Sequence, residues 1–268
     1  MPRKSHTKRH SSRDRYQHER SHPEDKRRSS RKRKNDSADI VDINSQSSHL
    51  NQAYTPRRST EELSPQNEAQ RQYISAIEQN SLTFGLGPAG TGKSYCAGAL
   101  ACEALESGRI EQIILTRPAV EAGEQLGFLP GDINDKFDVY IDAFRDILNQ
   151  RLGAGTVEYC LRHGRIVAAP LAFMRGKTFG ENTFVILDEA QNTSPTQMKM
   201  FLTRIGEDCK VVINGDIAQS DIHGANGLAD AAAKLRGVNG VHIHQFSHLD
   251  IVRSGLVRDI IARYEPES

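Results

Sequence analysis

From about Glu61 onward, short apolar runs alternate with longer segments in which apolar residues recur at helical spacing. This alternation predicts a mostly parallel sheet covered by helices on both faces. The expected strands are residues 82–86, 110–116, 165–169, 183–187, 210–214 and 241–244. The expected helices are residues 68–77, 93–106, 136–148, 195–205 and 228–235. One face of the third helix carries Phe137, Tyr140, Ile141, Phe144 and Leu148.

The first sixty residues lack this pattern and differ from the rest in charge. They hold 16 Lys and Arg against 7 Asp and Glu, which leaves 19 against 27 in the remaining 208 residues. A segment with so few apolar residues cannot bury enough surface to offset its chain entropy. We therefore expect a disordered basic arm over residues 1–60, followed by one acidic α/β domain over residues 61–268.

Neither export nor membrane insertion is expected from the chain. No apolar stretch follows the early basic residues Lys4, Lys8 and Arg9, as an export signal would require. No run is long enough to span a bilayer. The cysteines lack the paired spacing of a metal site or a disulfide framework: they are Cys96, Cys102, Cys160 and Cys209. We expect a cytoplasmic protein with no membrane partner, whose cysteines fill its core.

A glycine-rich segment follows the first expected strand and opens the second expected helix, which is the context that a P-loop requires. It reads Gly87, Pro88, Ala89, Gly90, Thr91, Gly92, Lys93 and Ser94, and we also assign the adjoining Tyr95 to the nucleotide site. Backbone N–H groups and the helix N-terminus would surround a phosphate. Lys93 would reach the β- and γ-phosphates and Ser94 would hold Mg²⁺, so ATP and Mg²⁺ are the expected cofactors. The alternative is a glycine-rich turn with an exposed lysine.

The fourth expected strand runs directly into two carboxylates, Asp188 and Glu189. Behind a P-loop, Asp188 suits a hold on Mg²⁺, and Glu189 is placed to polarise the attacking water. A solvated loop start is the alternative. After the fifth strand come Asp216 and Gln219, where an amide could sense the γ-phosphate with Asp216 as its polar support. An ordinary turn is the alternative there.

These motifs, in this order, closely resemble the PhoH family of ATPases over residues 62–266. Further matches are residues 115–124, 126–132, 169–176, 188–204 and 250–253. The resemblance implies a P-loop NTPase with a RecA-like sheet, similar to the first domain of superfamily-1 helicases and linked to phosphate starvation, RNA metabolism and bacteriophage genomes. It also implies that Gln70 grips the adenine edge, with Tyr73 nearby as packing or stacking. No folded domain with spaced acidic residues precedes the motifs, so we expect no ribonuclease activity.

Three arginines could neutralise charge in the transition state: Arg253, Arg175 and Arg204. A surface arginine is more often a solvated or salt-bridged group. Because only 80 residues follow Asp188, no second RecA-like domain is expected to supply such a charge. We therefore expect a ring or other homo-oligomer, in which a neighbouring subunit donates the arginine.

Histidines and basic clusters elsewhere admit a functional and a plainer interpretation. His242, His244 and His248 could suggest zinc, but alternation with apolar residues more simply places the first two on one face of an edge strand. Arm residues 26–28 and 31–34 could bind the phosphates of single-stranded RNA or another nucleic acid, or belong to a solvated tail. The loops around Arg117 and Arg175 are the competing place for nucleic acid.

The leading functional prediction is an ATPase that couples hydrolysis to nucleic-acid binding or remodelling, with RNA favoured. A small-molecule P-loop kinase is one alternative, although the Asp188 and Glu189 pair favours water as the acceptor. A nucleotide-gated binding module with slow hydrolysis is another. Phosphate release measured with and without RNA separates these three classes.

Overall fold

A computed structural model describes residues 61–118, 133–176, 178–222, 224–252 and 263, with the backbone alone for 133–139. The expected arm, residues 1–60, and the candidate Arg253 lie outside these residues. So do the side chain of Phe137 and the segment 119–132.

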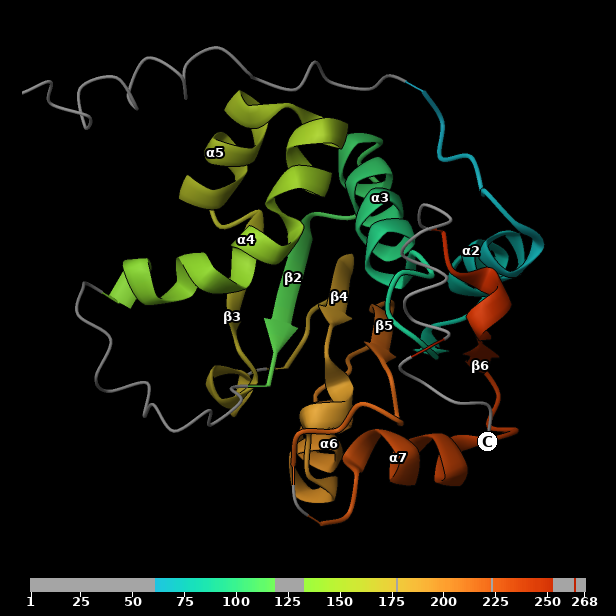
Figure 1. Ribbon diagram of the computed structural model, residues 1–268. Helices are drawn as coiled ribbons and strands as arrows, with labels where there is room; N and C mark the ends of the chain where they lie inside the picture. Colours follow the sequence, from blue (N-terminus) through green and yellow to red (C-terminus); the bar gives the residue numbers. More distant parts are fainter. Residues whose placement is uncertain (1–60, 119–132, 177, 223, 253–262, 264–268) are drawn as a thin grey trace, which may run out of the picture. The chain divides into compact units, whose positions relative to one another are not determined.

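The described chain forms a parallel sheet in the order β3-β2-β4-β5-β1-β6 (Figure 1). Its strands are β1 Leu82–Leu86, β2 Gln112–Arg117, β3 Ile166–Pro170, β4 Thr183–Leu187, β5 Lys210–Gly215 and β6 Val241–Gln245. All six correspond to strands expected from the sequence. In β1 and β4 every residue is buried, as strands covered on both faces require.

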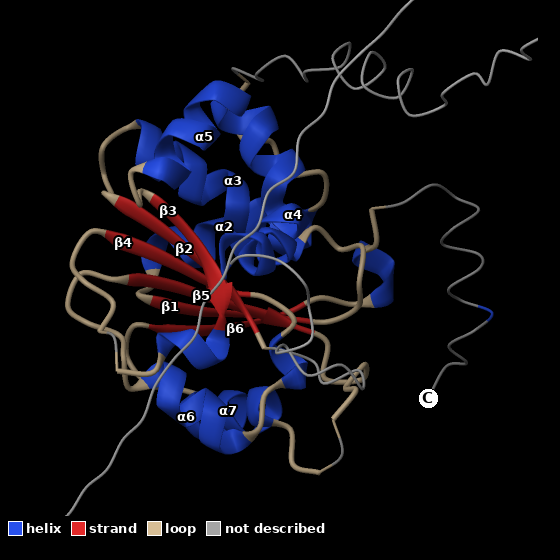
Figure 2. Ribbon diagram, turned by 90° about the vertical axis from the view of Figure 1, so that its left-hand side faces the viewer, coloured by secondary structure: helices blue, strands red, loops and turns tan. Residues whose placement is uncertain are grey.

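Helices cover both faces of this sheet, as Figure 2 shows. They are α2 Glu68–Gln79, α3 Lys93–Glu106, α4 Ile133–Leu152, α5 Ala154–Arg162, α6 Pro195–Leu202 and α7 Gly227–Leu235. Helices α2 to α5 pack on one face, whereas α6 and α7 pack on the other. The α/β fold class is therefore confirmed. Helix α5 was not expected from the sequence. No helix in the described residues is long and apolar enough to cross a membrane.

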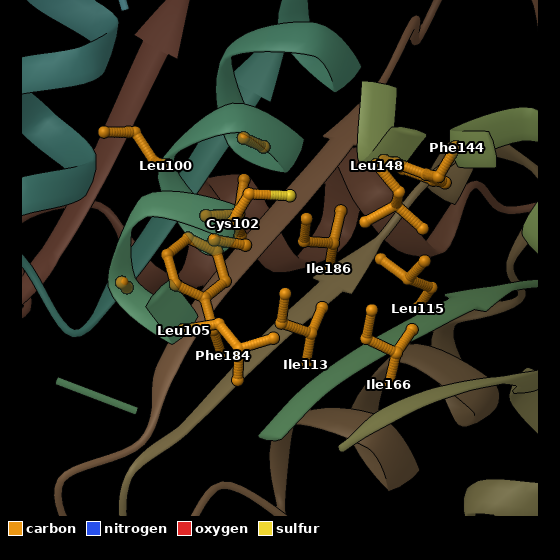
Figure 3. Packing of buried hydrophobic residues seen from close by; sticks show 14 of the residues in the cluster. Leu100, Cys102, Leu105, Ile113, Leu115, Phe144, Leu148, Ile166, Phe184 and Ile186 are labelled. Carbon is orange, nitrogen blue, oxygen red and sulfur yellow. The ribbon is translucent and has the colours of Figure 1, made fainter. Parts of the chain in front are cut away.

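The two faces of the sheet have separate hydrophobic cores, because successive strand side chains point to opposite sides. On β2, Ile113 and Leu115 join the core under α3 and α4, while Ile114 joins the one under α6 and α7. Figure 3 shows Phe144 and Leu148 of α4 meeting the β2 and β4 side chains of the first core. The cores fix the strands that carry the site.

Parallel strands end at one common edge of the sheet, and ligands of open α/β folds bind outside that edge. The segment Gly87–Ser94 follows β1, Asp188 follows β4, and Asp216 follows β5. Because β5 lies between β1 and β4 in the sheet, the chain beyond β5 lies between the glycine-rich segment and the acidic pair. The topology thus gathers three polar segments that are distant in sequence.

Candidate nucleotide-binding site

The glycine-rich segment after β1 turns tightly into α3. Gly92 precedes the helix with a positive φ of 88°, a backbone region that glycine adopts without steric cost. Lys93 begins the helix, and its Nζ donates to the carbonyls of Gly87 at 2.6 Å and Pro88 at 2.7 Å. Burial lowers the pKa of Lys93, against the opposing influence of nearby carboxylates such as Asp216. A cation therefore lies within the turn at a helix N-terminus, an arrangement suited to an anion.

Asp188 is almost fully buried directly after β4, with 3% of its surface exposed. One of its oxygens accepts a hydrogen bond from Ser94 Oγ at 2.8 Å. The other pairs with the guanidinium of Arg117 at the end of β2. A hydroxyl and a carboxylate in contact are hard oxygen donors of the kind that Mg²⁺ takes from proteins, with further ligands from phosphate and water. Ser94 and Asp188 therefore fit a magnesium ion.

Glu189 has a left-handed backbone, with φ of 54°, which is uncommon for a residue other than glycine. This conformation turns the chain from β4 into the 3-10 turn η3, Ala190–Asn192. The side chain is exposed, and its Oε2 accepts a hydrogen bond from Gln191 Nε2 at 2.7 Å. Strained backbone of this kind clusters at functional sites. The turn leaves the Glu189 carboxylate at the polar edge of the sheet.

The chain beyond β5 forms a compact turn. The backbone N–H of Gln219 donates to the Asp216 carbonyl at 3.0 Å, and the N–H of Ala218 donates to the Asp216 carboxylate at 3.1 Å. Asp216 thus supports the turn that carries Gln219. The role of Gln219 as a phosphate sensor stays a prediction.

These segments enclose one pocket of about 320 Å³. It is lined by Ala89, Gly90, Gly92, Lys93, Ser94, Tyr95, Asp188, Glu189, Gln191, Gly215, Asp216 and Gln219. The lining combines the lysine, the hydroxyl, the two carboxylates and the amide that were expected to handle phosphate. Side chains from three separate turns therefore converge on a single space.

Gln70 and Tyr73 lie on α2, beside the glycine-rich segment. Gln70 is buried, its Nε2 donates to the Thr91 carbonyl at 3.0 Å, and its Oε1 accepts from the Gln66 N–H at 2.9 Å. The side chain of Tyr73 is fully buried, and its hydroxyl donates to Asn214. Of the two roles considered for Tyr73, the structure shows packing, because no face of its ring is open for stacking. The adenine contact expected of Gln70 stays a prediction.

The other expected charged residues that the structure describes do not line this pocket. Arg175 is exposed and Arg204 is partly buried, and neither lines the pocket. His242 and His244 lie on β6, the edge strand, with ring centroids 6.2 Å apart, as the alternation predicts. His248 begins the 3-10 turn η4, His248–Asp250.

Arg117 and Gln191 belong to the site, but their contacts were not expected from the sequence. Arg117 was considered only for nucleic acid, whereas its side chain pairs with Asp188 and lies over the Phe144 ring at 5.8 Å. Gln191 bonds Glu189, two residues earlier. The available signal was their position, Arg117 as the last residue of β2 and Gln191 shortly after β4, since the carboxyl ends of parallel strands share one edge.

The structure combines a parallel sheet, a glycine-rich turn that opens a helix, and an acidic pair after another strand. Together these features define the class of P-loop NTPases. The particular family follows from comparison with known proteins. The sequence matches the family described as PhoH-like protein over residues 62–265, and the chain belongs to that family.

Named relatives agree with this assignment. The chain is 50% identical to a PhoH-like protein of Bacillus subtilis over 201 residues, 74% of this chain and 63% of that protein. It is 47% identical to protein PhoH of Escherichia coli K12 over 211 residues, 77% of this chain and 59% of that protein. The matches thus span about three fifths of these relatives.

A crystal structure of Pif1 helicase from Candida albicans matches with a TM-score of 0.35 and 12% identity, over 69% of this chain and 41% of that one.

Proposed function

We propose that this protein binds ATP with Mg²⁺ and hydrolyses it, and that hydrolysis is coupled to binding or remodelling of single-stranded RNA or another nucleic acid. One observation carries the proposal: a single pocket joins Lys93, Ser94, Asp188, Glu189 and Gln219. Membership of the PhoH-like family supports nucleotide binding.

Five side chains of the pocket have distinct tasks in this proposal. Lys93 exchanges its carbonyl partners for the β- and γ-phosphates, while Gly87–Ser94 offers backbone N–H groups to the same anion. Ser94 and Asp188 hold the metal, which when bound neutralises charge that develops on the phosphate oxygens. Tyr95 lines the pocket beside them. Phosphate binding thus falls to the buried Lys93, and activation of water to the exposed carboxylate of Glu189.

Glu189 orients and polarises the attacking water, and Gln219 contacts the γ-phosphate through its uncharged amide. A general base of this kind accelerates a reaction by about 10²- to 10⁴-fold. Water is the favoured acceptor because a carboxylate, Glu189, lies beside the proposed phosphate site.

The nucleic-acid partner is proposed from charge. The arm carries an excess of 9 positive charges and residues 61–268 an excess of 8 negative ones, so phosphate backbones favour the arm. Arg117 pairs with Asp188 and is poorly placed for RNA. Arg175 is exposed, and Phe173, two residues earlier in sequence, is 54% exposed. A homo-oligomer such as a ring would let a neighbouring subunit supply Arg253, Arg175 or Arg204 to the phosphates. We propose a cytoplasmic location.

The first test measures phosphate release with and without single-stranded RNA for the full chain and for Lys93→Ala. Loss of the ammonium group should abolish hydrolysis and weaken ATP binding, because no other described lysine lines the pocket. Lys234→Ala is the matched control, since Lys234 is 71% exposed and pairs with Asp230 on α7. Unchanged turnover in Lys93→Ala contradicts the proposal.

A second variant, Glu189→Gln, separates binding from chemistry. It keeps the shape of the side chain and an oxygen that can accept from Gln191, but removes the group that activates water. Turnover should fall by about 10²- to 10⁴-fold, while ATP still binds and persists. Glu207→Gln, at an exposed position, is the control. Wild-type turnover in Glu189→Gln would exclude Glu189 as the base.

A further inference from the structure

Gln191 is a buried residue of η3, with 4% of its surface exposed, and both ends of its amide are bonded. Its Nε2 donates to Glu189 Oε2 at 2.7 Å, and its Oε1 accepts from the backbone N–H of Asp216 at 3.1 Å. A backbone N–H can only donate, so it fixes which end of the amide carries the oxygen. The NH₂ group must therefore face the Glu189 carboxylate.

The backbone of the same turn is tied to the chain beyond β5. The Gln191 carbonyl accepts from Ser220 Oγ at 3.1 Å and from Asn226 Nδ2 at 3.2 Å. Next to it, Asn192 accepts from the Asp221 N–H at 2.9 Å and donates to the Asp221 carboxylate at 3.2 Å. The turn after β4 and the segment after β5 are thus held together at several points.

Close packing leaves the Gln191 amide little freedom. A Cβ placed on Gly215, the last residue of β5, would lie 2.6 Å from Gln191 Oε1. Real Cβ contacts are not this short, so the strand end needs glycine for the amide to reach the Asp216 N–H. The amide is therefore wedged between the end of β5 and Glu189.

We propose that Gln191 is a positioning residue that holds the Glu189 carboxylate and links its orientation to the segment 216–221, which carries Gln219. This inference rests on the proposed role of Glu189 in hydrolysis. A displacement of the Asp216 N–H moves the amide oxygen, and the rigid amide moves its NH₂ group and hence the carboxylate. The residue that senses phosphate and the residue that activates water then respond as one unit.

Gln191→Met tests the amide, because methionine has a similar length and cannot replace either strong hydrogen bond. Turnover should fall by about 10- to 100-fold, the scale of a misplaced catalytic group, while the Kd for ATP changes little and the melting temperature falls by a few degrees because the Asp216 N–H loses its acceptor. Asn192→Ala is the matched control: it loosens the same turn through Asp221 without touching the Glu189 side chain, so it should keep most of the turnover. Equal losses in both variants would assign the effect to the turn as a whole.

Gln191→Glu, alone and combined with Glu189→Gln, distinguishes loss of this one contact from a general loss of stability. Gln191→Glu keeps an acceptor for the Asp216 N–H but sets a second carboxylate against Glu189, so turnover and melting temperature should both fall. The exchanged pair restores one amide and one carboxylate. Its melting temperature should recover toward that of the wild type, while its turnover stays as low as that of Glu189→Gln. Failure of the melting temperature to recover contradicts the contact.

The turnover of Gln191→Met is also measured in the Glu189→Gln background. If Gln191 acts through Glu189, the second substitution lowers the residual turnover no further. A full additional loss in that background overturns the positioning role alone, as does wild-type turnover in Gln191→Met. Wild-type turnover in Glu189→Gln by itself overturns the proposed base and the inference together, so the two failures are distinguishable.

Discussion

Gln70 lies on helix α2, and its side chain contacts the glycine-rich segment. Its amide bonds the Thr91 carbonyl, and a Cβ on Gly92 would lie 2.5 Å from its Nε2. The side chain therefore supports the backbone that is proposed to surround the phosphates.

Loss of this support should make Gln70→Ala weaken ATP and inorganic triphosphate alike, about fivefold for a hydrogen bond of about 1 kcal/mol, and loss of the predicted adenine contact should weaken ATP further. Calorimetric titration of both ligands measures this. Equal losses for the two ligands would contradict the adenine contact implied by the family resemblance. Gln72→Ala, at an exposed position on the same helix, should change neither affinity.

Residues of the site were predictable from the sequence where the chemistry is local. Gly87–Ser94 and the pair Asp188 and Glu189 each lie on one short stretch beside a strand, and the structure brings them to one pocket. The Arg117 contact with Asp188 joins two strands that are far apart in sequence. Such contacts depend on strand order, which local patterns do not determine.

At the scale of elements, strands were predicted well and one helix was missed. Helix α5 begins just after Gly153, which has a φ of 84°, and includes Gly155; glycine within a short helix weakens its local signal. Burial of Val157 and Cys160 supplies the stability that the local sequence lacks, because packing outweighs intrinsic propensity in short helices. Helix α4 extends beyond its expected bounds at both ends.

Strand β6 carries a buried histidine, and this predicts a dependence of stability on pH. Burial, followed by the nearby His242, lowers the pKa of His244 from its ordinary value of 6.5. The unfolded chain therefore takes up a proton before the folded one, so the free energy of unfolding falls as the pH drops below about 6.5 and levels off below the folded pKa. His244 packs between Tyr73 and Phe246.

His244→Phe should remove this acid-dependent loss while keeping an aromatic ring in the cluster. Urea unfolding between pH 5 and 8 follows it, in the range where an ordinary histidine titrates. His163→Phe changes an exposed histidine and should leave the acid-dependent loss in place. An identical pH profile for His244→Phe and the wild type would contradict the prediction.

At the scale of the whole molecule, the charges divide between two parts of the sequence. The arm is strongly basic, whereas residues 61–268 are acidic. Residues 61–268 therefore attract phosphate backbones poorly. All the pocket-lining residues lie beyond the arm. Nucleotide chemistry and nucleic-acid affinity are therefore expected to be separable.

Deletion of residues 1–60 should leave basal ATP hydrolysis intact and weaken binding of single-stranded RNA. The log-log salt dependence should flatten by about three to four units if the arm contacts on the order of five phosphates, at about 0.7 per phosphate. Titration of labelled RNA with the full and shortened chains at several salt concentrations measures the slopes. Matching slopes would place the contact on the loops near Arg175 instead.

The strand order also determines when the site can form during synthesis. Strand β1 ends at Leu86, yet its sheet neighbours are β5, which begins at Lys210, and β6, which begins at Val241. At about 5–20 residues per second, the ribosome delivers those neighbours on the order of ten seconds after β1. The glycine-rich segment is therefore made well before the strands that flank β1, so the pocket proposed to bind nucleotide is expected to form only when the sheet is nearly complete.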